Sequence, residues 1–215
     1  MSRYFVGVGS QKAGTTWLHD QLARHPEVAL PERKEMHFFD AVHPVRQGQG
    51  FGVQYVRSLR RAIDNDHKGL ALRILGSLDM VHRGPATYLE RLDATATEDT
   101  RAIGEITPAY ANLTREGFLA IRDTLKSPKV LFTLRDPIDR HWSAVRMAVD
   151  GEQAAAHFAT GPFEKVAQGR GDYRTIVTLL DEIFGDDVLY LFFEDMFTAE
   201  TLERVARHLG VAESW

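Results

Sequence analysis

The length, composition and charge of this sequence are those of an ordinary globular protein. Its 215 residues are 44% hydrophobic and 26% charged, which argues against chain-wide disorder and suits one domain with a sizeable core. The absence of cysteine excludes disulfides and thiolate metal sites, and the net charge of −4 argues against general nucleic-acid binding. The sequence contains neither a signal-like start nor an apolar run of membrane-spanning length, so we expect a cytoplasmic protein without a membrane partner.

Short apolar segments alternate with helical patterns along the chain, which is typical of a parallel α/β sheet. Strands are predicted at residues 4–8, 102–105, 129–134 and 188–192. Helices are predicted at residues 15–24, 85–92, 115–125, 140–149, 173–184 and 199–209. We therefore predict a P-loop-like three-layer α/β/α fold with a central parallel sheet, formed by a single domain over residues 1–215.

The stretch 41–100 is less periodic than the rest and contains several glycines. We expect it to be an insertion on the acceptor side, over the carboxyl edge of the sheet, where ligands usually bind. Five basic residues in its middle could face an acidic acceptor or form a solvated helix face. They are Arg57, Arg60, Arg61, Lys68 and Arg73.

Residues 9–16, with the sequence GSQKAGTT, join the first predicted strand to the first predicted helix. The unpaired N–H groups of a first helical turn and the helix dipole attract anions. The spacing resembles the nucleotide P-loop GxxxxGK[ST], but Thr15 stands where that motif has its lysine and Lys12 lies inside the loop. A glycine turn without a ligand is the alternative. The candidate anion-binding residues are Gln11, Lys12, Ala13, Gly14, Thr15 and Thr16.

Two further segments carry candidate site residues. In 135–143, RDPIDRHWS, a strand delivers Arg135 to its carboxyl end and the next helix carries Ser143, so both could bind one phosphate. The alternative is a helix capped by Asp136 or Asp139, with Arg135 in a surface ion pair. In 31–40, PERKEMHFFD, Glu35 and His37 alternate with apolar residues and would face one side of an extended segment.

Apolar surroundings raise the pKa of a carboxyl group, so Glu35 is a candidate general base. A surface ion pair of Glu35 with His37 is the alternative.

All three segments resemble motifs of the sulfotransferases, in particular the Golgi-type carbohydrate sulfotransferases and their bacterial relatives. Residues 9–16 are similar to the 5′-phosphosulfate loop, RDPxxRxxS to the 3′-phosphate motif and KExHFFD to the acceptor-site segment. The resemblance implies the donor 3′-phosphoadenosine 5′-phosphosulfate (PAPS), the product 3′,5′-bisphosphate (PAP), no metal, and a small-molecule or glycan acceptor. It also implies Glu35 as the base, Lys12 and His37 as catalytic residues, and Glu35, His37 and Asp40 as acceptor-site residues.

Weaker resemblances follow in the second half of the chain. GEITPAY at 104–110 is similar to a family segment GEK[ST]PxY, with Ile106 in place of the lysine. Tyr173 resembles a family landmark and is either a nucleotide contact or a core tyrosine, the second reading being the stronger. Many members have a basic loop after the last helix, whereas this sequence ends at Trp215. Another segment or another subunit could replace that loop, or the chain could be incomplete.

The sequence thus predicts a sulfotransferase that acts on a hydroxyl group, or less readily on an amine. Two other classes stay open. A P-loop NTPase or small-molecule kinase is consistent with the fold, and would turn over ATP with magnesium. A noncatalytic nucleotide-binding protein would bind the bisphosphate without transfer.

Overall fold

The computed structural model describes residues 3–46, 51–148 and 171–213. Within them, one sheet of five parallel strands runs in the order β2-β3-β1-β4-β5. The strands are β1 (Tyr4–Gly9), β2 (Val28–Ala29), β3 (Ala102–Ile106), β4 (Lys129–Leu134) and β5 (Val188–Phe192). The four predicted strands and the parallel α/β class are confirmed, and the two-residue edge strand β2 is an addition.

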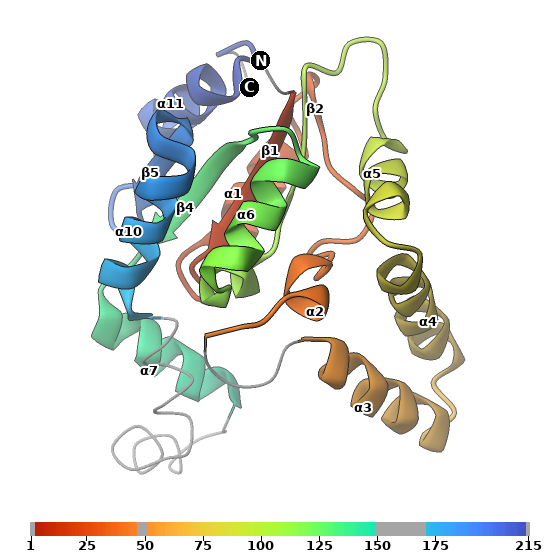
Figure 1. Cartoon of the computed structure of the whole chain (residues 1–215). Helices are drawn as coiled ribbons and strands as arrows, with labels where there is room; N and C mark the ends of the chain where they lie inside the picture. Colours follow the sequence, from red (N-terminus) through yellow and green to blue (C-terminus); the bar gives the residue numbers. More distant parts are fainter. Residues whose placement is uncertain (1–2, 47–50, 149–170, 214–215) are drawn as a thin grey trace.

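Helices cover both faces of the sheet, as Figure 1 shows with α6 on one side and α1 on the other. One apolar core joins the sheet to α5 (Pro85–Asp93), α6 (Arg115–Thr124) and α10 (Tyr173–Phe184). A second core joins the opposite face to α1 (Thr15–Leu22) and α11 (Ala199–Leu209). The three inner strands β3, β1 and β4 are therefore buried on both sides, which explains why they are continuous apolar runs, whereas the edge strand β5 is mostly half-buried. The predicted three-layer arrangement is confirmed.

Two helices in the stretch 41–100 were not predicted. Helices α3 (Phe51–Asp64) and α4 (Lys68–Arg83) pack on each other through Tyr55, Ala62 and Ile74 and lie to one side of the sheet (Figure 1). The apolar side chains of α4 are spread around the helix surface, since Leu70, Leu72 and Leu75 are exposed. In α3, by contrast, Tyr55, Leu59 and Ala62 recur at helical spacing on one face. The sequence therefore hides the helical period of α4, whereas that of α3 was present and was not recognised. The single domain and the insertion boundaries at 41–100 stay predictions.

The helix expected at 140–149 begins earlier, as α7 (Pro137–Ala148), and position 149 lies outside the described residues. Its start is fixed by Asp136, whose Oδ1 accepts hydrogen bonds from the amides of Ile138 at 2.9 Å and Asp139 at 3.0 Å. Proline at the first helical position is favourable there, because no amide partner is lost. The predicted start was wrong. The cap that the alternative assigned to Asp136 is confirmed, whereas the ion pair of Arg135 that belonged to the same alternative is not formed with any described residue.

The loops after β1, β3 and β4 all leave the sheet at its carboxyl edge, because the strands are parallel. The same edge carries α7 and the short elements α2 (Phe39–Val42) and η1 (Pro108–Asn112). The third short element, η2 (Gly185–Asp187), precedes β5. In the described part of the chain no helix is both long and apolar enough to cross a membrane. The carboxyl edge is therefore where the candidate site residues can meet.

Candidate active site

The loop after β1, residues 9–14, is held tightly against β4 and ends in the first turn of α1. The amide of Ser10 donates to the Thr133 carbonyl at 2.8 Å, and the Thr133 hydroxyl donates to the Gly9 carbonyl at 2.9 Å. Gly14 has φ +82°, and a Cβ there would lie 2.4 Å from Met196 Sδ, so only glycine fits. No described side chain caps α1, which leaves its first amides for an anion.

The predicted residues of this loop differ in exposure. Ala13 and Thr15 are buried, Gln11 and Lys12 are half-buried, and the Thr16 side chain is exposed. Lys12 adopts φ +69°, a left-handed conformation that is uncommon for a residue with a side chain. Its ammonium group lies 3.7 Å from Met147 Sδ on α7. The loop and α7 therefore approach each other around Lys12.

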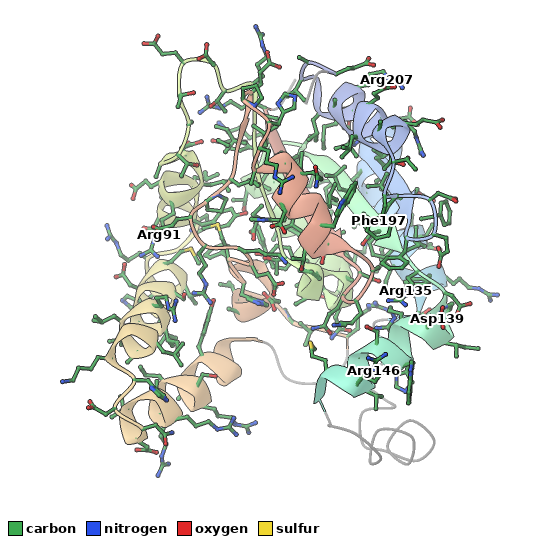
Figure 2. The ribbon with its side chains drawn as sticks, turned by 180° about the vertical axis from the view of Figure 1, so that it is seen from behind. Arg91, Arg135, Asp139, Arg146, Phe197 and Arg207 are labelled. Carbon is green, nitrogen blue, oxygen red and sulfur yellow. The ribbon has the colours of Figure 1, made fainter. Side chains whose placement is uncertain are left out.

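Arg135 lies directly beside this loop, at the end of β4. Its Nη1 donates to the Lys12 carbonyl at 3.2 Å, and its guanidinium lies 4.2 Å from the centre of the Phe193 ring. Figure 2 shows Arg135 at the edge of the sheet where α7 begins. Its Nε is buried and has no hydrogen-bond partner among the described residues. An arginine placed in this way has a donor left for an anion. Arg135 forms no ion pair with any described residue, so the surface ion pair that the sequence offered as an alternative is not observed.

Tyr173, at the start of α10, links Arg135 to the loop. Its hydroxyl donates to the Arg135 carbonyl at 2.9 Å and lies 3.2 Å from Ser10 Oγ. It also accepts from the Arg135 amide at 3.3 Å. The interpretation of Tyr173 as a core tyrosine is therefore incomplete. Its hydroxyl holds the Arg135 segment and the loop after β1 in place relative to each other. Ser143 is half-buried in α7 and makes no hydrogen bond to Arg135, so a shared phosphate stays a prediction.

The segment 31–40 brings Glu35, His37 and Asp40 together. His37 Nε2 lies 3.3 Å from Glu35 Oε2, and His37 Nδ1 lies 3.0 Å from Asp40 Oδ2. His37 and Asp40 are buried, whereas 37% of the Glu35 side chain is exposed. The segment is not extended as expected, because Glu35 has φ +62° and His37 has φ +53°. Two left-handed residues, and not strand alternation, turn these side chains toward each other.

Lys34 is a candidate that sequence reasoning did not assign, although it stands in the KExHFFD string. Its ammonium group donates to Thr16 Oγ1 at 2.6 Å and lies 3.9 Å from Glu35 Oε1. Lys34 therefore joins residues 31–40, which we call the Glu35 segment, to the first turn of α1. The signal available in the sequence was a cation next to the candidate base.

The charge state of His37 follows from its two carboxylate neighbours. Burial by itself lowers the pKa of His37, but hydrogen bonds to Asp40 and Glu35 outweigh this effect and raise it to about 9. His37 is therefore protonated near neutral pH. A charged imidazole between two carboxylates donates to both, so it orients Glu35 and does not compete with it for a proton.

The raised pKa of His37 predicts how stability depends on pH. Because the pKa rises on folding from 6.5 to about 9, the stabilisation is complete below pH 6.5 and is lost as the pH rises through 9. We expect the difference in unfolding free energy between the wild type and His37→Gln to shrink by about 3 kcal/mol across this window. Urea denaturation of both proteins at several pH values measures it, and parallel curves would contradict the assignment.

The buried carboxylate of Glu105 holds the backbone of the Glu35 segment in place. Glu105, on β3, accepts hydrogen bonds from the hydroxyls of Tyr88 and Tyr110 at 2.8 Å and of Thr107 at 2.6 Å. It also accepts from the amide of Met36 at 3.1 Å. All four partners donate, as the ionised form requires. Burial nevertheless raises the pKa of Glu105, and the four hydrogen bonds oppose that effect.

Two tyrosine hydroxyls complete this support. The Phe38 amide donates to the Tyr110 hydroxyl at 3.1 Å, and the Tyr55 hydroxyl donates to the Met36 carbonyl at 3.0 Å. The backbone on either side of His37 is thus held from β3, η1 and α3. The sequence showed Glu105 and Tyr110 as part of a family-like motif but did not reveal their supporting role. Their hydrogen-bond partners are up to 72 residues away along the chain.

Replacing Glu105 by glutamine is expected to cost about 1–3 kcal/mol of stability and to lower turnover. Glutamine keeps one accepting oxygen, but its NH2 group cannot accept. When NH2 replaces Oε2, the Met36 amide and the Thr107 hydroxyl lose their partner in a buried place. Urea unfolding and steady-state rates measure the two effects. Tyr88→Phe is the matched control, because it removes one donor and leaves the Met36 contact, so its effect on turnover should be small. Wild-type stability in Glu105→Gln would refute this role.

Comparison with known proteins agrees with this arrangement. A profile of the sulfotransferase family matches residues 5–215. The membrane-associated sulfotransferase kil1 of Dictyostelium discoideum is 25% identical over 145 residues, which are 67% of this chain and 23% of that protein. The chain thus spans about a quarter of the length of this curated relative.

Solved structures resemble the fold. A sulfotransferase from Alicyclobacillus acidocaldarius has a TM-score of 0.71 at 23% identity, with 100% of this chain and 83% of that chain covered. A sulfotransferase domain of the Synechococcus PCC 7002 olefin synthase has a TM-score of 0.60 at 19% identity, with coverage of 97% and 72%. The family profile spans almost the whole sequence and includes all three motif segments. The chain therefore belongs to the sulfotransferase family.

Proposed function

We propose that the protein transfers the sulfuryl group of PAPS to a hydroxyl, less readily to an amine, of a small molecule or glycan. The observation that carries this proposal is the Lys34–Thr16 hydrogen bond of 2.6 Å. It joins an anion-binding helix start to a segment with a candidate base, and group transfer needs such adjacent donor and acceptor sites. Family membership supports the same reading.

The residues present fit the donor. The uncapped amides of α1, with Lys12 and the hydroxyls of Thr15 and Thr16, would hold the phosphosulfate. Gln11, Ala13 and Gly14 complete that loop. Arg135, whose buried Nε has no described partner, would hold the 3′-phosphate together with Ser143. PAPS supplies an activated sulfuryl group when it is bound.

The side chains of the Glu35 segment would handle the acceptor. Glu35 would take the proton of the acceptor hydroxyl, since its carboxylate is partly exposed beside a protonated His37. Asp40 balances the charge of His37 from the other side at 3.0 Å. Lys12 would stabilise negative charge near the glycine loop. No metal is needed in this scheme. That expectation and the cytoplasmic location stay predictions.

Ligand-dependent thermal stability tests the proposal against the two alternatives. A ligand at a hundred times its dissociation constant adds about 2.7 kcal/mol of stability. We expect the bisphosphate PAP to stabilise the protein without metal and AMP to do so less, because AMP lacks the 3′-phosphate for Arg135. A preference for ATP with magnesium would favour a kinase or NTPase. Binding of PAP with no transfer from PAPS to a panel of hydroxyl acceptors would favour a noncatalytic protein.

A further inference from the structure

A cavity of about 810 Å³ lies beside the Glu35 segment, between that segment and helices α4 and α5. Lys34 and Met36, the two neighbours of Glu35, both line it. Figure 2 shows Arg91, another lining residue, on the opposite side of the molecule from Arg135. The cavity is therefore adjacent to the proposed base and separate from the proposed site of the 3′-phosphate.

The charge of the lining is strongly positive. Its basic side chains are Arg33, Lys34, Arg73 and Arg91, and its acidic side chain is Glu32. Asp79, which is outside the lining, contacts Arg91 at 3.4 Å in a half-exposed pair that contributes little energy. Arg73 is exposed and forms no ion pair with any described residue. An anion entering this cavity would meet several arginines that are not neutralised within it.

One of these cations is already held in place. The Arg33 guanidinium donates to Ser77 Oγ and lies 5.6 Å from the centre of the Tyr55 ring. Neither contact neutralises its charge, and both restrict its motion. An ordered guanidinium loses less entropy on binding an anion than a mobile surface lysine does.

The rest of the wall is largely apolar. Pro31, Met36, Met80 and Ala94 line the cavity. Because Met36 and Met80 are only 4% and 2% exposed, an apolar ligand reaches them when their side chains shift. Methionine side chains adapt to irregular apolar ligands. A cationic cavity with such a wall matches a ligand that has an apolar body and an anionic group.

We propose that this cavity is the acceptor subsite, and that it selects small amphiphilic acceptors with an anionic group, such as a carboxylate or sulfonate, on an apolar body. The proposal rests on the proposed function, which places the reacting hydroxyl at Glu35. The anionic group binds to Arg73 and Arg91, and the apolar body lies on Met36 and Met80. The acceptor thus enters from the α4–α5 side.

A pair of matched dyes tests the subsite without requiring turnover. The anion 8-anilinonaphthalene-1-sulfonate and the neutral N-phenyl-1-naphthylamine differ by the sulfonate. Both are titrated into the protein with and without saturating PAP. We expect the anion to bind at one site that PAP does not block. Arg73→Gln with Arg91→Gln should weaken the anion at least tenfold and leave the neutral dye unchanged. Arg60→Gln, an exposed arginine outside the lining, is the control.

Displacement of the bound anion tests the ligand class. We expect 3-(4-hydroxyphenyl)propionate to displace it and the methyl ester of that acid to fail. Three outcomes would overturn the proposal. In the first, the double variant loses equal affinity for both dyes. In the second, Arg60→Gln weakens binding of the anion as much as the double variant does, and in the third the methyl ester displaces the anion. Stronger displacement by a sulfated disaccharide would overturn the inference that the acceptor has an apolar body. If PAP does not bind while the dye selectivity holds, the proposed function fails and this subsite stands.

Discussion

Glu35→Gln is expected to lower the turnover number for sulfuryl transfer by about a thousandfold. Glutamine keeps the size of the side chain and can still accept from His37 Nε2, which lies 3.3 Å from the carboxylate in the wild type. It cannot take a proton from the acceptor, so the loss should be in kcat. Transfer from PAPS to a phenolic or alcoholic acceptor, measured by the release of PAP, gives the rate.

The same variant should bind PAP as the wild type does, because Glu35 does not belong to the glycine loop. Glu98→Gln, on an exposed loop, is the matched control and should keep full turnover. Loss of PAP binding together with turnover would show that Glu35 supports folding and not proton transfer. Undiminished turnover would remove Glu35 from the mechanism.

Lys12→Ala is expected to reduce turnover by a factor of about 10² to 10³. Its side chain carries the full positive charge of the glycine loop, and a fixed cation stabilises charge that develops during transfer more than charge already present. The variant should therefore lose more in kcat than in PAP affinity. Steady-state kinetics and the thermal shift with PAP separate these two quantities.

Lys68→Ala is the control for Lys12→Ala, because Lys68 is highly exposed at the start of α4 and its ion pair is long. It should change neither quantity. Lys12→Arg should recover part of the rate, since it restores a charge with a different shape. If Lys12→Ala kept the full rate, the role of catalytic cation would be assigned to Lys34 instead. The ammonium group of Lys34 lies 2.6 Å from Thr16 Oγ1.

The fold could be predicted because its three inner strands are buried on both faces and the four longer strands are short apolar runs. The glycine loop was also readable, since a strand, a glycine turn and a helix start follow one another in the sequence. By contrast, β2 has two residues and α4 exposes several apolar side chains, so neither produces a clear period. The apolar residues of α3 do follow a helical period, and that signal was missed. Local patterns predict elements only where burial follows one face.

The candidate site was predicted in its residues but not in its geometry. The left-handed conformations of Glu35 and His37 have no sequence signature, because non-glycine residues adopt them only when tertiary contacts compensate the strain. Those contacts come from Glu105, Tyr110 and Tyr55, and the last two lie on elements that are remote from the segment in sequence or were not predicted. The support for Met36 and Phe38 therefore needed the structure.

The hydrogen bond between Lys34 and Thr16 has a thermodynamic consequence for the coupling of the two proposed binding sites. The Thr16 hydroxyl accepts from Lys34 and can still donate its own hydrogen to a bound anion, so Lys34 is connected to the proposed donor site through one hydroxyl. Lys34 also lines the acceptor cavity. The two binding sites then share one side chain, so each ligand changes the affinity of the other by the same factor. We therefore expect binding of the donor to change the affinity of the acceptor cavity through Lys34.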